Sequence, residues 1–170
     1  MTNSRIPKIG EKDSKNNKLR IWIDADATPK EVNAIASKAG ARCEVEVLFV
    51  SNHRINLPLH NQYVRSIPVG PGEDVADNYI AEHVEEGDLV ITADIPLAAR
   101  VVTQEVLVIS PRGEEYNKDN VRERLSIRDF MHDIRSIGIQ TGGPKPYGIK
   151  EKKLFAETLD RLLTKALSNQ

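Results

Sequence analysis

The chain has 170 residues, of which 39% are hydrophobic and 29% charged, and its 24 basic and 25 acidic side chains leave a formal net charge of −1. This length predicts one domain whose core is stable without disulfide bonds. The balanced charge excludes a polycation that coats nucleic acid. The single cysteine, Cys43, excludes an internal disulfide, a cysteine-based zinc site and a CxxC redox pair.

The first 18 residues are polar and rich in lysine, and they lack the apolar segment of a secretory signal. We expect residues 1–18 to form a flexible leader and residues 19–170 to form a single domain. No apolar run approaches the ~18 residues that a membrane span requires. The sequence therefore predicts a soluble, cytoplasmic protein with no membrane partner.

Short apolar runs and helical spacing alternate along the next part of the chain. Strands are expected at residues 19–23, 44–50, 63–69, 88–92 and 106–109. Helices are expected from Thr28, as N-cap, to Gly40, as the stop signal, and at residues 74–84 and 95–103. Beyond Pro111 the strands stop, and helices over 117–137 and 150–167 flank a Gly/Pro loop.

This alternation is typical of right-handed βαβ units on a parallel sheet that is covered on both faces. We therefore predict an α/β fold, a three-layer α/β/α sandwich with a mainly parallel sheet of four or five strands plus C-terminal helices.

Carboxylates follow several of the predicted strands, and ligands of such sheets bind beyond the carboxyl ends of the strands. Asp24 and Asp26 follow the first strand, and two residues apart on an extended chain both side chains point the same way. Asp94 follows the fourth strand, and Asp74 and Asp77 share a face at a helix start. Clustered anions repel unless a cation binds them, so these five residues predict a Mg²⁺ or Mn²⁺ site.

Each acid taken alone also fits a structural role. Asp74 fits a helix N-cap, Asp77 a favourable charge in a first turn, and Asp94 a cap for the helix that starts at Pro96. The set favours a site, because Asp24 and Asp94 both follow buried strands, where folding does not require an acid.

The stretch from Asp24 to Thr28 also matches the Asp-x-Asp-x-Thr sequence of haloacid-dehalogenase-like phosphatases, in which the first Asp is the nucleophile. Those enzymes also need a Ser or Thr after a later strand, a role that Thr92 or Ser110 can fill. No adjacent acidic pair follows a strand, as their pattern requires. A phosphatase that uses Asp24 as nucleophile is therefore the alternative.

The second half of the chain carries basic and glycine-rich segments. Arg112 and Arg128 are candidate ligands for substrate phosphate, since arginine forks suit phosphates, although interleaved acids also fit a solvated helix face. Thr141, Gly142 and Gly143 form a loop whose backbone can approach an anion closely, and a plain turn is the other interpretation.

Several motifs together resemble the YaiI/YqxD family of uncharacterised bacterial proteins. They are Ile23-Asp24-Ala25-Asp26-Ala27, Asp74-Val75-Ala76-Asp77, residues 88–98, Pro111-Arg112-Gly113-Glu114, residues 128–131 and Thr141-Gly142-Gly143-Pro144. The similarity runs from about Lys18 to the C-terminus. It departs from the family at Thr28, where a Cys commonly precedes the proline, and in the extra leader.

The resemblance implies a PIN-like nuclease fold with an acidic metal site at the strand ends. By position, Asp24 and Asp94 match the acids after the first and fourth strands of PIN-like enzymes. The combined prediction is a metal-dependent nuclease that hydrolyses phosphodiester bonds, with RNA as substrate, by water attack. Asp24, Asp26, Asp77 and Asp94 are the predicted catalytic residues, and these four with Asp74 are the predicted metal ligands. A non-catalytic protein of the same fold that binds RNA or a partner remains a further alternative.

Overall fold

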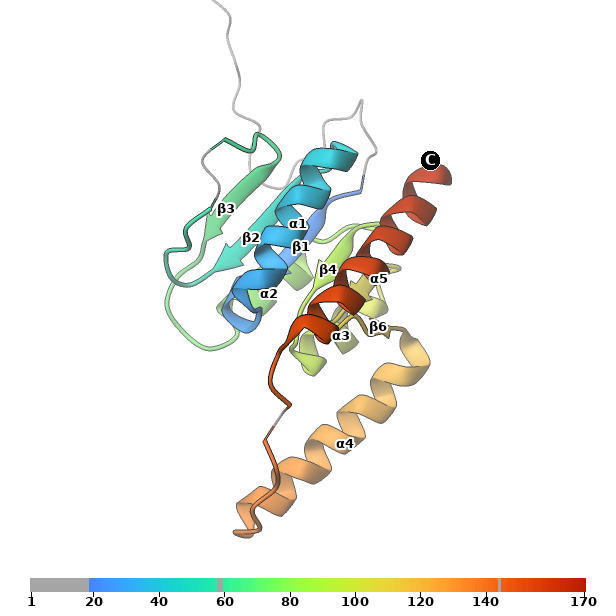
Figure 1. Cartoon of the computed structure of the whole chain (residues 1–170). Helices are drawn as coiled ribbons and strands as arrows, with labels where there is room; N and C mark the ends of the chain where they lie inside the picture. Colours follow the sequence, from blue (N-terminus) through green and yellow to red (C-terminus); the bar gives the residue numbers. More distant parts are fainter. Residues whose placement is uncertain (1–18, 58–59, 144) are drawn as a thin grey trace, which may run out of the picture.

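The computed structural model describes residues 19–57, 60–143 and 145–170 (Figure 1). The expected leader at residues 1–18 lies outside the described residues. Among the helices of the described part, none is long and apolar enough to cross a membrane.

A six-stranded sheet with the order β3-β2-β1-β4-β5-β6 forms the centre of the fold. The first five strands in this order pair in parallel, and β6 pairs antiparallel with β5. The parallel strands confirm the predicted sheet, and the two-residue β6 adds an edge that no apolar run had indicated. The strands are β1 (Ile21–Asp24), β2 (Val47–Ser51), β3 (Val64–Pro68), β4 (Leu89–Ile91), β5 (Leu107–Ile109) and β6 (Glu115–Tyr116).

In the described residues, five α-helices connect and flank these strands, as the sequence pattern predicts, and a short 3₁₀ helix that it does not predict follows β1. They are η1 (Ala25–Ala27), α1 (Lys30–Cys43), α2 (Val75–His83), α3 (Ile95–Val102), α4 (Lys118–Ser136) and α5 (Ile149–Ser168).

Side chains alternate along the buried strands and divide the core into two layers. On one face Ile21 and Ile23 of β1 pack with α1 and α5, where Phe155 is fully buried. On the other face Trp22 packs with α2 and α3, including Ile80. The result is the predicted three-layer α/β/α sandwich, with α1 and α5 on one side of the sheet and α2 and α3 on the other (Figure 1).

The entry into α1 differs from the expectation. Pro29, not Thr28, occupies the N-cap position, and the Thr28 hydroxyl donates to the carbonyl oxygen of Asp24. Gly40 does not stop the helix, which continues to Cys43 and ends at Glu44 in the left-handed region, with φ of 55°. Thr28 therefore fastens the turn after β1 instead of capping the helix.

Gly40 is required for a close approach between α1 and β2. A Cβ atom built there lies 2.8 Å from the carbonyl oxygen of Val45 and against the Val47 side chain. Gly40→Ala is expected to destabilise the fold by about 1–3 kcal/mol, because this overlap outweighs the gain of about 1 kcal/mol in helix propensity. Chemical denaturation measures the difference. Gly70→Ala is the control, since nothing lies within 4 Å of its added Cβ, and equal stability of the two variants would contradict the prediction.

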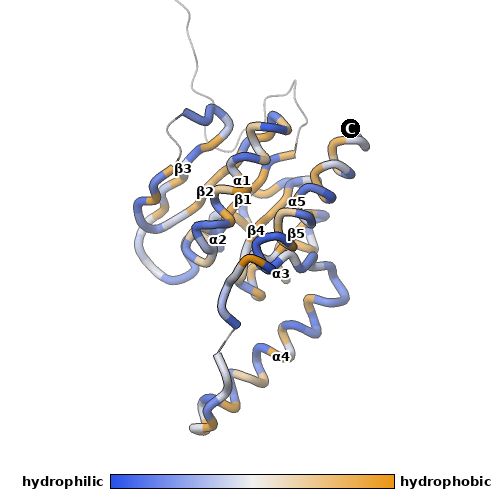
Figure 2. The backbone as a smooth tube through the Cα atoms, viewed as in Figure 1, coloured by the Kyte–Doolittle hydropathy of each residue, from blue (hydrophilic) through white to orange (hydrophobic). Residues whose placement is uncertain are grey.

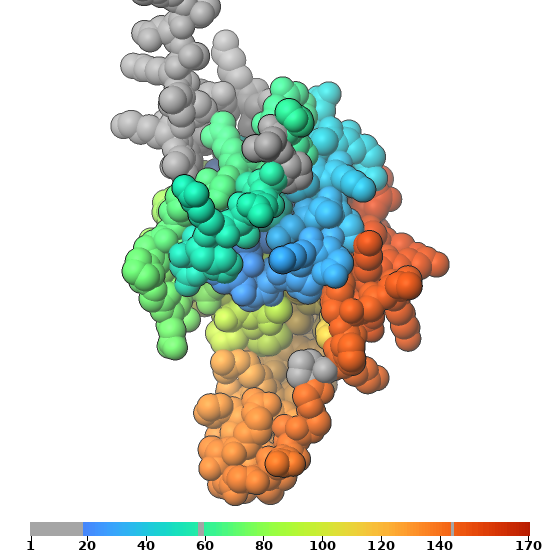
Figure 3. Space-filling view, turned by 60° about the vertical axis from the view of Figure 1, so that its left-hand side comes forward, coloured from blue at the N-terminus to red at the C-terminus, as the bar shows by residue number. Residues whose placement is uncertain are grey.

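Helix α4 begins against α3 and then projects from the body as an arm (Figures 1 and 3). Its only buried residue is Val121, and its outer part mixes charged side chains with exposed apolar ones such as Ile127 and Phe130 (Figure 2). The arginines of α4 are therefore in contact with solvent.

Candidate functional site

Asp24 is the last residue of β1 and lies at the carboxyl edge of the sheet. It follows Trp22 by two residues, so its side chain is directed to the face that α2 and α3 cover. Only 2% of Asp24 is exposed, and Thr92, directly after β4, donates a hydrogen bond of 3.0 Å to its Oδ2. A buried carboxyl group with one hydroxyl partner is costly to ionise, which sets it apart from a solvated capping residue.

Asp94 combines a capping role with a place beside this carboxyl group. Its Oδ1 accepts from the backbone N–H of Leu97 at 2.9 Å, so the expected N-cap of α3 is present. Its own N–H donates to the Thr92 hydroxyl at 3.0 Å. Thr92 therefore couples the positions of Asp24 and Asp94.

Asp77, in the first turn of α2, joins the two other carboxyl groups. Its carboxyl group interacts electrostatically with those of Asp24 and Asp94. The carboxyl groups of β1, α2 and α3 thus converge as the strand-end rule predicts.

The ionisation of the cluster reflects this crowding. Burial raises the pKa of Asp24 to about 6, and the charges of Asp94 and Asp26 add to the rise, while the bond from Thr92 opposes it. Burial and then the charges of Asp94 and Asp24 raise the pKa of Asp77 to about 7, to which Asp74 also contributes. The cluster therefore holds protons at a pH where isolated carboxyl groups are ionised.

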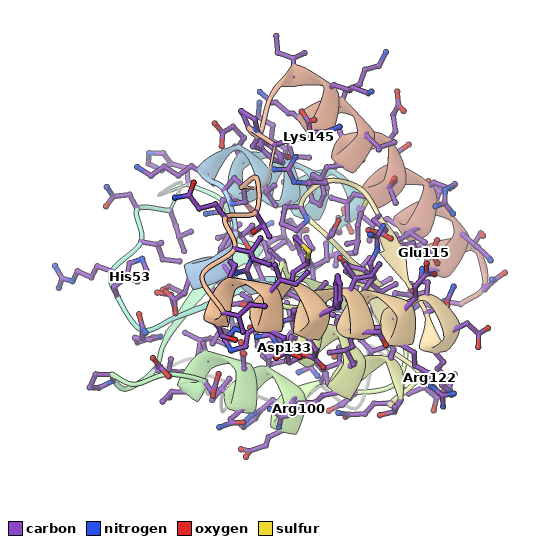
Figure 4. All side chains as sticks on the ribbon, turned by 90° about the horizontal axis from the view of Figure 1, so that it is seen from below. His53, Arg100, Glu115, Arg122, Asp133 and Lys145 are labelled. Atoms are coloured by element: carbon purple, nitrogen blue, oxygen red, sulfur yellow. The ribbon has the colours of Figure 1, made fainter. Side chains whose placement is uncertain are left out.

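Asp26 is oriented differently from the expectation. The chain turns into η1 directly after Asp24, so the alternation of an extended chain does not apply. Asp26 Oδ2 accepts from the backbone N–H of Asn52 at 3.0 Å, and Oδ1 lies 2.7 Å from Nδ1 of His53. Asp26 is thus held by the loop after β2, in which Figure 4 labels His53, and it acts on Asp24 through its charge.

Asp74 stands at the N-cap position of α2, but its side chain makes no capping hydrogen bond. Its backbone is in the left-handed region, with φ of 61°, which is uncommon for a residue other than glycine. Its negative charge nevertheless reaches Asp77. The expected capping role is absent, and Asp74 belongs to the margin of the acidic cluster.

The cluster is not arranged as a ready-made metal cage. Within the described ranges, no three His, Cys, Asp or Glu side chains are placed so that they could hold a metal ion. Burial and the mutual repulsion of the carboxyl groups instead raise the pKa values of Asp24 and Asp77. The donor set itself, carboxylate oxygens from three elements, has the chemistry that Mg²⁺ and Mn²⁺ prefer.

The predicted phosphate ligands fall in different places. Arg112 is in the turn before β6, where it donates to the carbonyl oxygen of Lys145, in the segment that leads to α5 (Figure 4). Arg128 is on the exposed arm, and its Nη1 lies 3.4 Å from Oδ1 of Asp129. Residues 141–143 are in the connection from α4 to α5, and a Cβ at Gly142 or Gly143 meets nothing within 4 Å. Their role in binding substrate stays a prediction.

A cavity of about 530 Å³ is lined by chain neighbours of two predicted site acids, although none of those acids lines it. Ala27 and Ala93 line it; Ala27 follows Asp26 in the chain, and Ala93 precedes the cluster acid Asp94. Arg112 and two tyrosines contribute much of the remaining wall; the other lining residues are Thr28, Pro29, Ser110, Pro111 and Glu114.

Sequence reasoning missed some of these roles. Thr92 was considered only for a phosphatase, although it precedes Asp94 by two residues at a strand end. His53 follows β2, and β2 ends at the same edge as β1. The strand-end rule that identified Asp24 could therefore also have identified His53. Tyr147 carries no such signal, because it follows a loop far along the chain.

A profile of the family described as "Uncharacterized BCR, YaiI/YqxD family" matches residues 22–165. The chain belongs to this family. The match confirms the resemblance seen in the motifs around Asp24 and Asp94, and it covers β1 through most of α5.

Relatives in the same family are similar over most of their length. A UPF0178 protein of Myxococcus xanthus is 47% identical over 152 residues, which are 89% of this chain and 99% of the relative. A UPF0178 protein of Hahella chejuensis is 48% identical over 86% of this chain and 97% of its own length. One from Vibrio cholerae is also 48% identical, over 86% and 98% respectively.

Proposed function

We propose that this protein is a metal-dependent nuclease that hydrolyses phosphodiester bonds, with RNA in the cytoplasm as its substrate. The observation that carries the proposal is the convergence of Asp24, Asp77 and Asp94, from three separate elements, at the carboxyl edge of a parallel sheet. Folding alone has no need of such a set, since burial and mutual repulsion make its ionised form unfavourable. A divalent cation relieves both costs.

The carboxylates of Asp24, Asp77 and Asp94 would hold Mg²⁺ or Mn²⁺, with Asp74 adding negative charge at the margin. When bound, such a cation supplies an activated water and offsets the charge that develops on the phosphate oxygens during in-line displacement. Thr92 fixes the Asp24 carboxylate by donating to Oδ2. Ligation requires Asp77 to release its proton, so cation affinity is expected to rise between pH 6 and 8.

Asp26 and His53 would orient water or substrate beside these ligands. Their contact of 2.7 Å holds the carboxylate of Asp26 toward the loop after β2. Arg112 would bind the substrate phosphate at the other side, while Arg128 and the loop at Thr141–Gly143 would extend the contact along the nucleic acid.

The phosphatase alternative has less support. It requires Asp26 as general acid and base next to the nucleophile Asp24. Both oxygens of Asp26 are already engaged, one by Asn52 and the other by His53. The cluster around Asp24 consists of acids, which suits a cation more than a phosphoryl group.

The test is cleavage of labelled single-stranded RNA by wild type, Asp24→Asn and Asp94→Asn, with Mn²⁺ and with EDTA. Loss of a ligand to the cation removes several kcal/mol of transition-state stabilisation, so each variant should lose at least about 100-fold in rate. Asp160→Asn is the matched control, because Asp160 is an exposed acid on α5 that pairs with Arg42.

Two outcomes would contradict the nuclease. RNA binding that persists in EDTA without any cleavage in Mn²⁺ would favour a non-catalytic binding protein. Turnover of a phosphomonoester, trapped at Asp24 by beryllofluoride, would favour the phosphatase.

A further inference from the structure

The cavity beside the acidic cluster has a wall built around an anchored aromatic ring. Tyr147 is half-buried, and its hydroxyl donates to the carbonyl oxygen of Pro111 at 2.9 Å. The guanidinium of Arg112 lies over the ring, 5.9 Å from its centroid. Ring and guanidinium together present flat surfaces that need no further ordering when a planar ligand arrives.

Arg112 contacts two residues that flank Tyr147 in the sequence. It donates to the carbonyl oxygen of Lys145 and lies 3.9 Å from Oε1 of Glu151. Tyr116, which is buried, lines the cavity too. The wall is therefore fixed by contacts within the protein and does not depend on a ligand for its shape.

The rest of the lining combines small apolar residues, Ala27, Pro29, Ala93 and Pro111, with the polar side chains of Thr28, Ser110 and Glu114. A volume of about 530 Å³ is in the range of small-molecule sites and exceeds what a phosphate group alone would fill. Aromatic and guanidinium faces are the groups on which unstacked bases stack. The chemistry of this wall therefore matches a nucleobase.

The position of the cavity matches the same ligand. Ala27 directly follows Asp26 and Ala93 directly precedes Asp94, so each alanine Cα lies ~3.8 Å from the Cα of the neighbouring acid. A nucleotide carries its base next to its phosphate. A phosphodiester held at the acids would therefore have an adjoining base within reach of the cavity.

We propose that the cavity is a base-binding subsite in which one unpaired base of the substrate stacks against the wall that Tyr147 and Arg112 form together. The proposal rests on the proposed function, since it makes this base the neighbour of the reacting phosphate. It names the substrate class, a nucleic acid strand whose base is free to leave its stack. A base in an intact duplex cannot enter.

The test separates binding from catalysis by working in EDTA. AMP, UMP and ribose 5-phosphate are titrated into wild type, Tyr147→Ala, Tyr147→Phe and Tyr63→Ala, and NMR shifts report affinity. In wild type, AMP should bind at least about fivefold and up to about 150-fold more tightly than ribose 5-phosphate, with UMP between them. Tyr147→Ala should lose this advantage.

The other variants make the result specific to the stack. Tyr147→Phe keeps the ring and should keep most of the advantage. Tyr63→Ala, at a half-buried tyrosine before β3, should match wild type. Equal binding of AMP and ribose 5-phosphate by wild type, or an unchanged preference in a folded Tyr147→Ala, would overturn the subsite. If Tyr147→Ala does not fold, Tyr147→Phe decides the question. A folded Tyr147→Phe that binds AMP no more tightly than ribose 5-phosphate would also overturn the subsite.

Failure of the two proposals is distinguishable. Base-dependent binding in EDTA without RNA cleavage in Mn²⁺ supports the subsite and contradicts the nuclease. Metal-dependent cleavage of single strands and duplexes at equal rates supports the nuclease and contradicts the subsite.

Discussion

Replacement of Asp88 by alanine is expected to destabilise the protein by about 3–5 kcal/mol, because it leaves a buried guanidinium without its main partner. Asp88 is fully buried directly before β4. Its carboxylate accepts from the backbone N–H of Arg20, the guanidinium of Arg20, the indole N–H of Trp22 and the backbone N–H of Glu85, each at 3.0 Å. Arg20 itself is 5% exposed.

Urea denaturation of Asp88→Ala, Asp88→Asn and Asp160→Ala measures this prediction. Asp88→Asn retains one acceptor oxygen and should lose less than Asp88→Ala. Asp160→Ala breaks an ion pair with Arg42 of similar length, 2.9 Å, but both side chains are more than 60% exposed, so it should cost less than about 1 kcal/mol. Similar stability of the two alanine variants would show that burial does not govern the effect.

The parallel sheet could be predicted from the sequence because its strands are buried on both faces. Such strands appear as continuous apolar runs, as in Ile21–Ile23 and Leu89–Ile91. The ends of the strands could be predicted less closely, because they carry polar residues that are also typical of turns. The short strand at Glu115–Tyr116 has no apolar run, and it is recognised only by its antiparallel pairing with β5.

The convergence of the acids was predictable from the same topology. Parallel strands end at one edge, so Asp24 and Asp94 had to be close once β1 and β4 became neighbours. The direction of Asp26 was not predictable, because it depends on the 3₁₀ turn after β1 and on the loop at His53. The aromatic wall depends on the return of the chain from α4 to α5, which no local pattern encodes.

Glycine and threonine near α1 show the limit of local rules. Gly40 resembles a helix stop, yet tertiary contact with Val45 and Val47 requires it inside the helix. Thr28 resembles an N-cap, yet its hydroxyl donates a hydrogen bond to the backbone carbonyl oxygen of Asp24. In both cases a contact with another segment of the fold determines the structural role of the residue. The local sequence pattern contains no information about that contact.

Asp24→Asn is expected to stabilise the metal-free protein at pH 8 by about 2–3 kcal/mol, which follows from a pKa raised by about two units at ~1.4 kcal/mol each. The pKa of Asp24 is about 6 in the folded protein and 3.8 is the ordinary value. The folded state therefore holds its proton more firmly than the unfolded chain. Stability from this group is fully present below pH 4 and is lost as the pH rises through 6.

Asparagine keeps an oxygen that can accept from Thr92 and never acquires the charge. The variant should therefore equal wild type near pH 4 and exceed it at pH 8, as thermal unfolding in EDTA measures. Asp77→Asn should act in the same direction, since the pKa of Asp77 is raised to about 7. A variant less stable than wild type at pH 8 would contradict the ionisation argument.

Addition of Mn²⁺ should reverse this order. A cation that binds only the ionised folded cluster stabilises wild type in proportion to the logarithm of its concentration above the dissociation constant. Asp24→Asn removes one negative charge from the cluster and should gain much less at the same Mn²⁺ concentration. Because protons compete with the cation for Asp24 and Asp77, the gain of wild type should be larger at pH 8 than at pH 5.5. A Mn²⁺ effect of equal size in both proteins would place the cation elsewhere, whereas a gain confined to wild type would tie the instability of the acidic cluster to its function.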